Sequence, residues 1–505
     1  MTYTIFTQFD CSFIASGHLA NILERVKELA IKGHTINMVY CDKYFTNTCS
    51  SNLSSCSSIC NVCMLYKNNL FSYLPKGINY IPLSKYQHLI QQDYSLPLFS
   101  NVEELKRMEY NGVKIGYAAF STYLTLSRNL NPLFDNEFID YMRKSMTICC
   151  QYSDIVRAII KDTTPDIIGC FNSRVLYARP IVDIAKELNI KHLCYETTYN
   201  ANGKQAKIAF NTTPHNVEEN TRLINDLWNS TTLSQEEKTR IAEEFFYKRK
   251  HSIPSGDKLY VKDQVQGLMP QDWDNNKHNI LILNSSEDEY AALGEEFENK
   301  SLFKSQLQGL KYMIDTFKDD KDYHFYLRVH PNLKGIKYQY HTKLYELFKH
   351  ADNFTIIEPE SKISTYALMD QCDKVVVFGS TTGPESAYLG KPTILLSYCI
   401  YSLLDICYTP KDLREFNAYI YNKDLKPNNK TNALKYGYYR MNDEYENYQY
   451  YKYEIKHIKI LGKKAVICVY DINWIRKTYG IILQLIGKIF YEKYLWYPTK
   501  EDCLI

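Results

Sequence analysis

Short apolar runs separated by amphipathic stretches recur along this chain, and they predict strands joined by helices. The first apolar run spans residues 3–8, and a helical pattern with apolar positions three and four residues apart covers 18–32. Gly33 ends that helix, and a second apolar run follows at 35–41. A strand–helix–strand unit joins parallel strands by a right-handed crossover. The sequence therefore predicts an α/β fold from its first residues.

The same alternation stops and resumes once, which predicts two domains. A stretch rich in Gly, Pro, Asp and Asn covers residues 255–276 and has the composition of a linker. Before it, residues 216–250 form a charged helical pattern, which we expect to be a solvent-exposed arm between the halves. After it, strand and helix patterns alternate again. We therefore predict two doubly wound, Rossmann-like parallel-sheet domains facing each other across a cleft, over 1–254 and 277–430, and a Tyr-rich segment over 431–505 whose helices pack back across both.

Composition narrows the class of protein without naming a function. Of 505 residues, 45% are hydrophobic and 23% are charged, which is ordinary for a globular protein, and a net charge of +3 gives no basis for binding nucleic acid. We see no signal-peptide pattern at the N-terminus and no apolar run of the ~20 residues that span a bilayer. We expect a cytoplasmic protein, with at most peripheral contact with the inner face of the plasma membrane.

The strongest chemical signal is a hydroxyl-rich turn after a buried strand. The apolar run 375–378 predicts the strand, and Pro384 opens a short helix that ends at Gly390. Between them lie Gly379, Ser380, Thr381, Thr382 and Gly383. The N–H groups and hydroxyls of such a turn favour an anion, and Glu385 is placed to accept from a sugar hydroxyl. A strand–helix connection with ordinary capping is the alternative interpretation.

A second candidate element lies in the same predicted sheet. Arg328 and His330 fall on one side at the carboxyl end of a strand, and Pro331 forces the chain to leave it. Ligands of open α/β sheets bind at those ends, so a guanidinium and an imidazole there predict a phosphate clamp. A surface ion pair is the alternative. In the stretch after the first strand of this half, Ser285 or Ser286 is expected to cap a helix.

The first half offers several acid–base candidates at strand ends. Glu196 could act as a general base toward an incoming hydroxyl, and Arg174 could bind the donor or pair with that carboxylate. The loop after the first strand presents Asp10, and His18 begins the following helix. The sequence leaves the choice among Glu196, His18 and Asp10 open.

A cysteine cluster forms the remaining candidate site. Cys60 and Cys63 form a CxxC pair, with Cys41 and Cys49 upstream in a loop rich in Ser and Asn. Four thiolates can hold a structural zinc ion, although structural sites usually have two such pairs. Unliganded thiols and redox chemistry are the alternatives.

Together these motifs resemble the bacterial glycosyltransferases of capsule and surface-polysaccharide biosynthesis, which have the GT-B fold. The resemblance rests on Cys60-x-x-Cys63, Phe171-Asn-Ser-Arg174, Arg328-Val-His-Pro-Asn332 and Gly379-Ser-Thr-Thr-Gly383. The His-Pro element followed by a Ser/Thr pair is also similar to enzymes that use CMP-activated sugars, such as Kdo and polysialic acid transferases. The resemblance implies that His330, Ser380 and Thr381 hold the nucleotide phosphate.

The sequence thus predicts a glycosyltransferase that needs no metal for catalysis. It would move a sugar from a nucleotide-activated donor to a growing surface polysaccharide or a lipid-linked glycan. The predicted donor site comprises Arg174, Arg328, His330, Ser380, Thr381, Thr382, Gly383 and Glu385. The alternatives are a teichoic-acid-type polyol-phosphate transferase, a non-catalytic zinc-stapled glycan assembly protein and a sugar-nucleotide 2-epimerase.

Overall fold

The computed structural model describes most of the two predicted halves. It covers residues 1–7, 16–45, 64, 67, 71, 74–91, 93–197, 206–253, 260–336, 346, 348, 351–442, 449–454, 457–460 and 463–464. Within these ranges, no helix combines the length and the hydropathy that crossing a membrane requires.

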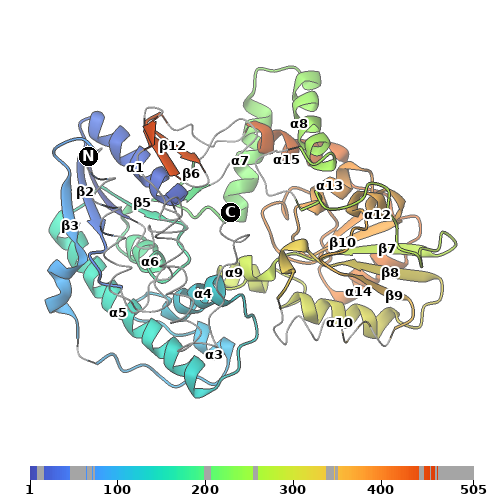
Figure 1. Cartoon of the computed structure of the whole chain (residues 1–505), viewed down its shortest axis with the longest axis horizontal. Helices are drawn as coiled ribbons and strands as arrows, with labels where there is room; N and C mark the ends of the chain where they lie inside the picture. The colour runs from blue at the N-terminus through green and yellow to red at the C-terminus, as the bar shows by residue number, and fades with distance from the viewer. Residues whose placement is uncertain are drawn as a thin grey trace, which may run out of the picture.

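The N-terminal domain is built on a six-stranded sheet in the order β3-β2-β1-β4-β5-β6 (Figure 1). Its strands are β1 (Thr2–Phe6), β2 (Thr35–Tyr40), β3 (Asn79–Pro82), β4 (Ile167–Phe171), β5 (Lys191–Thr197) and β6 (Ala206–Phe210). The first five are parallel, and β6 runs antiparallel to β5. The connecting elements are α1 (Ser16–Ile31), η1 (Leu83–Leu89), α3 (Val102–Lys106), α4 (Ile115–Ser127), α5 (Asn136–Thr163) and α6 (Arg179–Glu187).

Alternating residues of β1 supply two separate apolar cores in this domain. Ile5 packs with Ile22 and other residues of α1, whereas Phe6 packs into the larger core with residues of α4, α5 and α6. Successive strand side chains point to opposite faces, so a strand covered by helices on both sides is apolar throughout. The predicted parallel sheet covered on both faces is confirmed.

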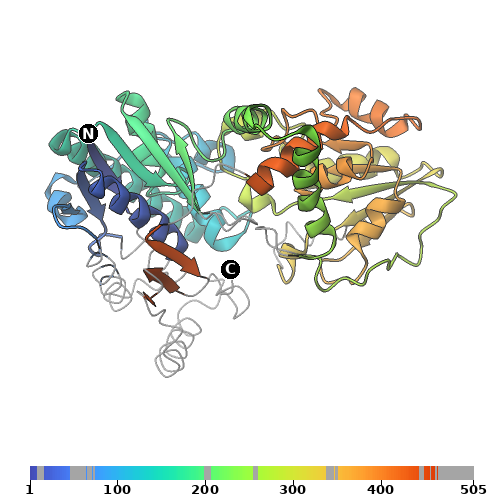
Figure 2. The same cartoon turned by 90° about the horizontal axis from the view of Figure 1, so that it is seen from above.

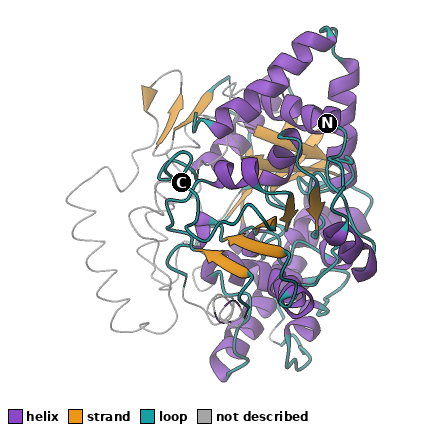
Figure 3. Cartoon of the chain, turned by 90° about the vertical axis from the view of Figure 1, so that its right-hand side faces the viewer, coloured by secondary structure: helices purple, strands orange, loops and turns teal. Residues whose placement is uncertain are grey.

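The C-terminal domain repeats this arrangement with five parallel strands in the order β11-β10-β7-β8-β9. They are β7 (His278–Leu283), β8 (Tyr323–Arg328), β9 (Phe354–Ile357), β10 (Lys374–Val377) and β11 (Thr393–Leu395). The short and long helices around them are η2 (Glu287–Glu289), α9 (Glu295–Asn299), α10 (Gln306–Phe317), η3 (Pro331–Leu333), α12 (Thr365–Gln371), α13 (Thr382–Tyr388) and α14 (Leu413–Tyr421). Alternate residues of these strands belong to two apolar cores that also contain helix residues. Figure 3 views the molecule from the side of this domain, with strands in orange and helices in purple.

The charged stretch expected to be an exposed arm instead packs on the second domain. It forms α7 (Val217–Ser230) and α8 (Gln235–Lys250), which pack against α15 (Lys430–Asn442), and α15 in turn packs against α13 (Figures 1 and 2). Phe245 is fully buried there, and Phe246 stacks on Tyr388 with ring centroids 4.1 Å apart. The expectation was wrong because α8 has a narrow stripe of apolar residues among many Glu and Lys residues. Burial of that stripe is enough to pack the helix on the domain.

A small antiparallel sheet follows α15 and was not among the predicted elements. It consists of β12 (Tyr451–Glu454), β13 (His457–Ile460) and β14 (Lys463–Lys464). This sheet packs on α1 of the N-terminal domain, where the Glu24 carboxylate accepts hydrogen bonds from the backbone N–H groups of Gln449 and Tyr450. The chain therefore returns to the first domain after completing the second.

Candidate functional site

A cavity of about 240 Å³ lies at the carboxyl ends of β7, β8 and β10. Strand order reverses between β7 and β10, because the chain adds β8 and β9 on one side and β11 on the other. Loops diverge at such a switch point, so open α/β sheets bind their ligands there. The cavity is lined by Asn284, Ser285 and Ser286 after β7, by His330 after β8, and by Ser380, Thr381 and Thr382 after β10.

Hydrogen bonds within the protein hold the turn after β10 in place. Gly379 adopts a φ of +79°, a left-handed conformation that favours glycine. The Thr382 hydroxyl donates to Ser380 Oγ over 2.8 Å, and the buried Tyr401 hydroxyl donates to the Ser380 carbonyl oxygen over 2.5 Å. The hydroxyl-rich turn is thus fixed in place at the cavity wall.

His330 caps the short helix η3 while its ring lies at the cavity. Its backbone N–H donates to Asn284 Oδ1 over 2.7 Å, and its Nδ1 accepts from the backbone N–H of Asn332 over 3.2 Å. The neutral ring therefore carries its proton on Nε2. The Tyr260 ring contacts His330 edge-on, with centroids 4.7 Å apart.

Arg328 also reaches the cavity, but it holds a neighbouring loop. The residue is only 2% exposed, and its guanidinium donates to the backbone carbonyls of Glu358 and Ser361 after β9. Burial lowers the pKa of this arginine to about 10, and the nearby Glu360 carboxylate opposes that shift. Both terminal nitrogens of Arg328, which was predicted to clamp a phosphate, therefore donate to this loop.

Glu385 has partners that the sequence did not indicate. Its Oε1 accepts from Arg249 Nε over 2.9 Å, and its Oε2 accepts from the Tyr366 hydroxyl over 2.5 Å. The carboxylate is 2% exposed, so both oxygens are engaged by protein donors rather than directed to solvent. Burial and the adjacent carboxylate raise the pKa of Tyr366 above its usual value.

Sequence reasoning missed Arg249, which lines the same cavity. It lies in the basic run Lys248–Lys250 at the end of α8, which resembles an ordinary helix C-terminus. Nothing local distinguishes it from its neighbours. Its role depends on how α8 docks against α13.

In the N-terminal domain, Glu196 is held at the end of β5. The Asn172 side chain donates to its carboxylate from a turn in which Asn172 and Ser173 have φ values of 61° and 85°. Such positive φ values are strained for residues other than glycine and cluster at functional sites. Lys207 lies directly opposite Glu196 in the β5–β6 pairing.

Arg174 and His215 belong to the same cluster of polar side chains as Glu196 and Lys207. Arg174 Nη1 donates to the backbone carbonyl of Glu289 over 2.8 Å, so it contacts the second domain. Burial, together with the nearby charges of Arg174 and Lys207, lowers the pKa of His215 to about 3. His215 therefore stays neutral at mildly acidic pH, where an ordinary histidine is protonated.

Basic residues of the first domain meet an acidic stretch of the second. Lys106 Nζ lies 2.6 Å from the Glu298 carboxylate, and Lys114 Nζ lies 3.3 Å from that of Glu295. These pairs place α9 beside α3 and α4 (Figure 1). A cavity of about 130 Å³ lies at this junction and has Gly379 in its wall. The turn after β10 thus borders both this cavity and the one at the switch point.

The profile of a family described as "Capsule polysaccharide biosynthesis protein" matches residues 190–451, just over half of the chain. The chain belongs to this family. The matched region runs from β5 through α15 into β12, so it contains Glu196, the α8 segment and the complete switch-point cavity.

Among the solved structures to which this chain is similar are two of low identity and low TM-score. One is the beta Kdo 2,4 transferase of KpsC from Thermosulfurimonas dismutans, with 16% identity and a TM-score of 0.36, covering 64% of this chain and 88% of that one. The other is the UDP-GlcNAc 2-epimerase from Neisseria meningitidis, with 11% identity and a TM-score of 0.25, covering 86% of this chain and 97% of that one. No curated protein sequence matches. At these identities and TM-scores the two structures carry no argument about the activity of this capsule-family chain.

Several predicted residues lie outside the described ranges. They are Asp10, Cys49, Cys60 and Cys63, and for His18 only the backbone, within α1, is described. Cys41 is half-buried. Among the described residues, no group of three or more His, Cys, Asp or Glu side chains is arranged to hold a metal ion. The predicted zinc site stays a prediction.

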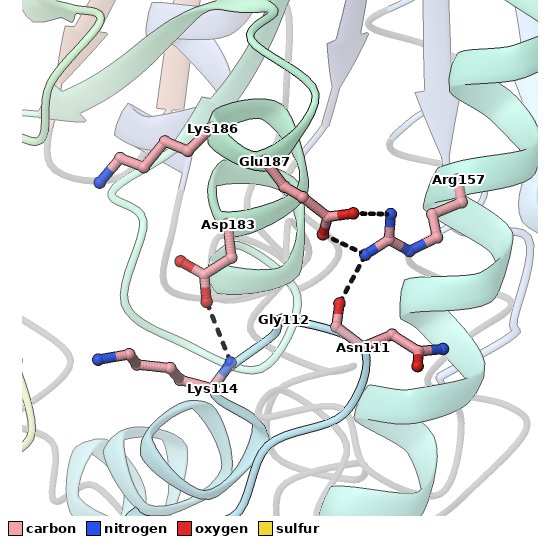
Figure 4. Close-up of a pocket in the computed structure, with 7 residues that line it drawn as sticks. All are labelled: Asn111, Gly112, Lys114, Arg157, Asp183, Lys186 and Glu187. Carbon is pink, nitrogen blue, oxygen red and sulfur yellow. Dashed lines mark hydrogen bonds and ion pairs between the residues drawn. The ribbon is translucent and has the colours of Figure 1, made fainter.

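A wider cavity of about 850 Å³ lies on the N-terminal domain, away from the predicted site residues (Figure 4). Both acidic side chains in its wall already accept hydrogen bonds from the protein. Arg157 makes two hydrogen bonds to the Glu187 carboxylate, and Asp183 accepts from the backbone N–H of Lys114 over 3.1 Å. Internal pairing leaves less attraction for a charged ligand, so we place the candidate site in the smaller cavity at the switch point.

Proposed function

We propose that this capsule-family protein is a glycosyltransferase that uses a nucleotide-activated sugar as its donor. The acceptor would be a growing surface polysaccharide or a lipid-linked glycan, at the cytoplasmic face of the plasma membrane. The observation that carries the proposal is the convergence of His330, Ser380, Thr381 and Thr382 on one cavity at the switch point. An imidazole N–H donor and the hydroxyls of Ser380 and Thr381 suit a phosphate, which offers acceptor oxygens only.

The donor phosphate would be the leaving group of the transfer. Negative charge grows on its oxygens as the bond to the sugar breaks, and fixed donors aimed at those oxygens lower the barrier without reorganising. His330 is oriented for this because its Nδ1 is occupied by the Asn332 N–H, which leaves the proton on Nε2. We propose that these groups act without a catalytic metal ion.

The acceptor hydroxyl must lose its proton as it attacks. Glu196 is our first candidate for the base, because Asn172 orients its carboxylate at the carboxyl edge of the first sheet. Asp10 and His18 stay as alternatives for this role.

A thermal-shift experiment tests the donor half of the proposal. Purified protein would be screened against CMP, CDP, UDP, GDP and their sugars. A ligand at ~100 times its dissociation constant adds roughly 2.7 kcal/mol of stability. We expect one nucleotide to stabilise the wild type, to stabilise His330→Ala much less, and to stabilise the control His88→Ala fully, since His88 is an exposed residue of the first domain.

The outcomes separate the alternatives. No shift with any nucleotide would contradict the proposal and favour a glycan-binding assembly protein. A nucleotide shift with phosphodiester linkages in the product would indicate a polyol-phosphate transferase. Turnover of the sugar nucleotide without an acceptor would indicate an epimerase.

A further inference from the structure

Arg249 enters the switch-point cavity from a helix outside the two sheets. It lies in the last turn of α8, and it lines the cavity together with Ser380, Thr381 and Thr382. Its Nη2 is 3.4 Å from Thr381 Oγ1, so the guanidinium borders the hydroxyl-rich turn directly. Arg249 is 8% exposed, which places its charge at the cavity wall rather than in bulk solvent.

The orientation of this guanidinium is fixed by a buried acid. Arg249 Nε is 2.9 Å from Glu385 Oε1, and the Tyr366 hydroxyl binds the other carboxylate oxygen. A guanidinium is planar, so fixing Nε also fixes the plane that contains both terminal nitrogens. The ion pair offsets the cost of burying the arginine, and it sets the direction in which the two terminal nitrogens point.

The other arginine of the cavity is placed differently. Both terminal nitrogens of Arg328 donate to the loop carbonyls of Glu358 and Ser361, whereas Arg249 Nη2 lies beside Thr381. A phosphate bound by the turn would therefore lie next to Arg249. Guanidinium–phosphate hydrogen bonds are among the strongest in proteins, more so where the site is shielded from water.

We infer that Arg249 is the cation that binds the donor's phosphate in this cavity, and that Glu385 positions Arg249 rather than binding a sugar hydroxyl. The inference rests on the proposed function, since it names a residue for the nucleotide that function requires. It assigns a binding role to a helix that precedes the second domain in sequence and packs onto it in space.

The test compares a nucleotide with its own nucleoside. Dissociation constants would be measured by calorimetry for the nucleotide that stabilises the wild type and for the same base and ribose without phosphate. For Arg249→Gln we expect the nucleotide to bind roughly tenfold to a hundredfold more weakly, the usual loss for a hydrogen bond to a charged group. Binding of the nucleoside should be unchanged. Arg249→Lys should lose less, because it keeps the charge.

Arg240→Gln is the matched control, since Arg240 lies exposed on the same helix α8. We expect it to bind both ligands like the wild type. Equal nucleotide affinity in Arg249→Gln and Arg240→Gln would overturn the inference and leave the proposed function standing. An equal loss for nucleotide and nucleoside would also overturn it, because the arginine would then only shape the cavity. A wild type that binds no nucleotide would overturn both.

Removing Arg249 alone leaves the Glu385 carboxylate buried without its cation, which lowers the stability of the folded protein. The double variant Arg249→Gln/Glu385→Gln removes both charges and retains two amides that can bond to each other. If Arg249→Gln does not fold, the double variant replaces it in the same measurements. We expect the same loss of nucleotide affinity, and the outcomes given above would overturn the inference in the same way.

Discussion

Arg128 of the first domain forms an ion pair with Asp288 of the second, with 2.9 Å between Arg128 Nε and Asp288 Oδ2. The same guanidinium donates to Ser286 Oγ over 2.9 Å and to the Asn332 carbonyl oxygen over 3.0 Å. Ser286 lines the switch-point cavity, and Asn332 donates its backbone N–H to His330. The contact between the domains therefore includes residues that shape the candidate donor site.

We predict that Arg128→Ala destabilises the protein by roughly 1–3 kcal/mol, the cost of leaving partly buried acceptors unsatisfied. The side chains of Arg128 and Asp288 are 16% and 13% exposed. Arg222 is the control, because its ion pairs at 2.6 Å are exposed and lie within one helix. Its replacement by Ala should change stability much less than Arg128→Ala does, because exposed ion pairs contribute little. Urea unfolding measures both, and equal losses would contradict a specific role for the domain contact.

We predict that Glu196→Gln lowers kcat by roughly a hundredfold to ten-thousandfold, the usual contribution of a general base. The amide keeps the size of the side chain and can still accept from Asn172, so the melting midpoint should stay close to that of the wild type. The exposed Glu236→Gln is the control. If kcat of Glu196→Gln stays within a few-fold of the wild type, the base must be sought at Asp10 or His18.

We predict that His215 makes the protein less stable at mildly acidic pH. Its folded-state pKa is about 3, against an ordinary value of 6.5, so the unfolded chain binds a proton that the folded chain does not. As pH falls below about 6.5, each unit costs up to roughly 1.4 kcal/mol until the folded pKa is reached. Unfolding at pH 7.5 and 5.5 measures this slope. The slope should be smaller in His215→Gln, and identical slopes in the two proteins would contradict the prediction.

We predict that Gly383→Ala disturbs the turn after β10. A Cβ at this position would lie 2.6 Å from the Tyr401 hydroxyl, which is the group that binds the Ser380 carbonyl. Overpacking of this kind typically costs about 1–3 kcal/mol. Gly294→Ala is the control, because a Cβ there would meet no atom within 4 Å. Melting curves compare the two variants, and nucleotide binding should weaken in Gly383→Ala alone.

We predict that zinc copurifies with the protein through Cys41, Cys49, Cys60 and Cys63. Elemental analysis of protein purified without added metal measures this, and Cys60→Ser should lose the zinc. Cys170→Ser is the control, because Cys170 is buried in the first sheet and distant in sequence from the cluster. Equal metal content in both variants would leave unliganded thiols or redox chemistry as the explanation.

Much of the second domain could be predicted from the sequence. The apolar run 375–378 forms β10 at Lys374–Val377, and the hydroxyl residues after it do line a cavity with His330. Both features follow from local rules, since strand ends of a parallel sheet meet at one edge. By contrast, Ser285 or Ser286 was expected to cap a helix, but η2 has no side-chain cap. Ser286 Oγ accepts from Arg128 instead, and Ser285 Oγ donates to the Phe378 carbonyl oxygen. A local rule fails where a distant cation competes for the same oxygen.

The α/β class, the two domains and the residues of the switch-point loops can be predicted from the sequence, because periodicity and turn chemistry act over a few residues. Which side chains meet depends on how the helices and sheets pack together. Arg249 and Glu385 lie 136 positions apart in the chain, and they meet because buried Phe245 and Phe246 dock α8 on the second domain. Their ion pair follows from packing between helices, and no pattern local to either residue indicates it.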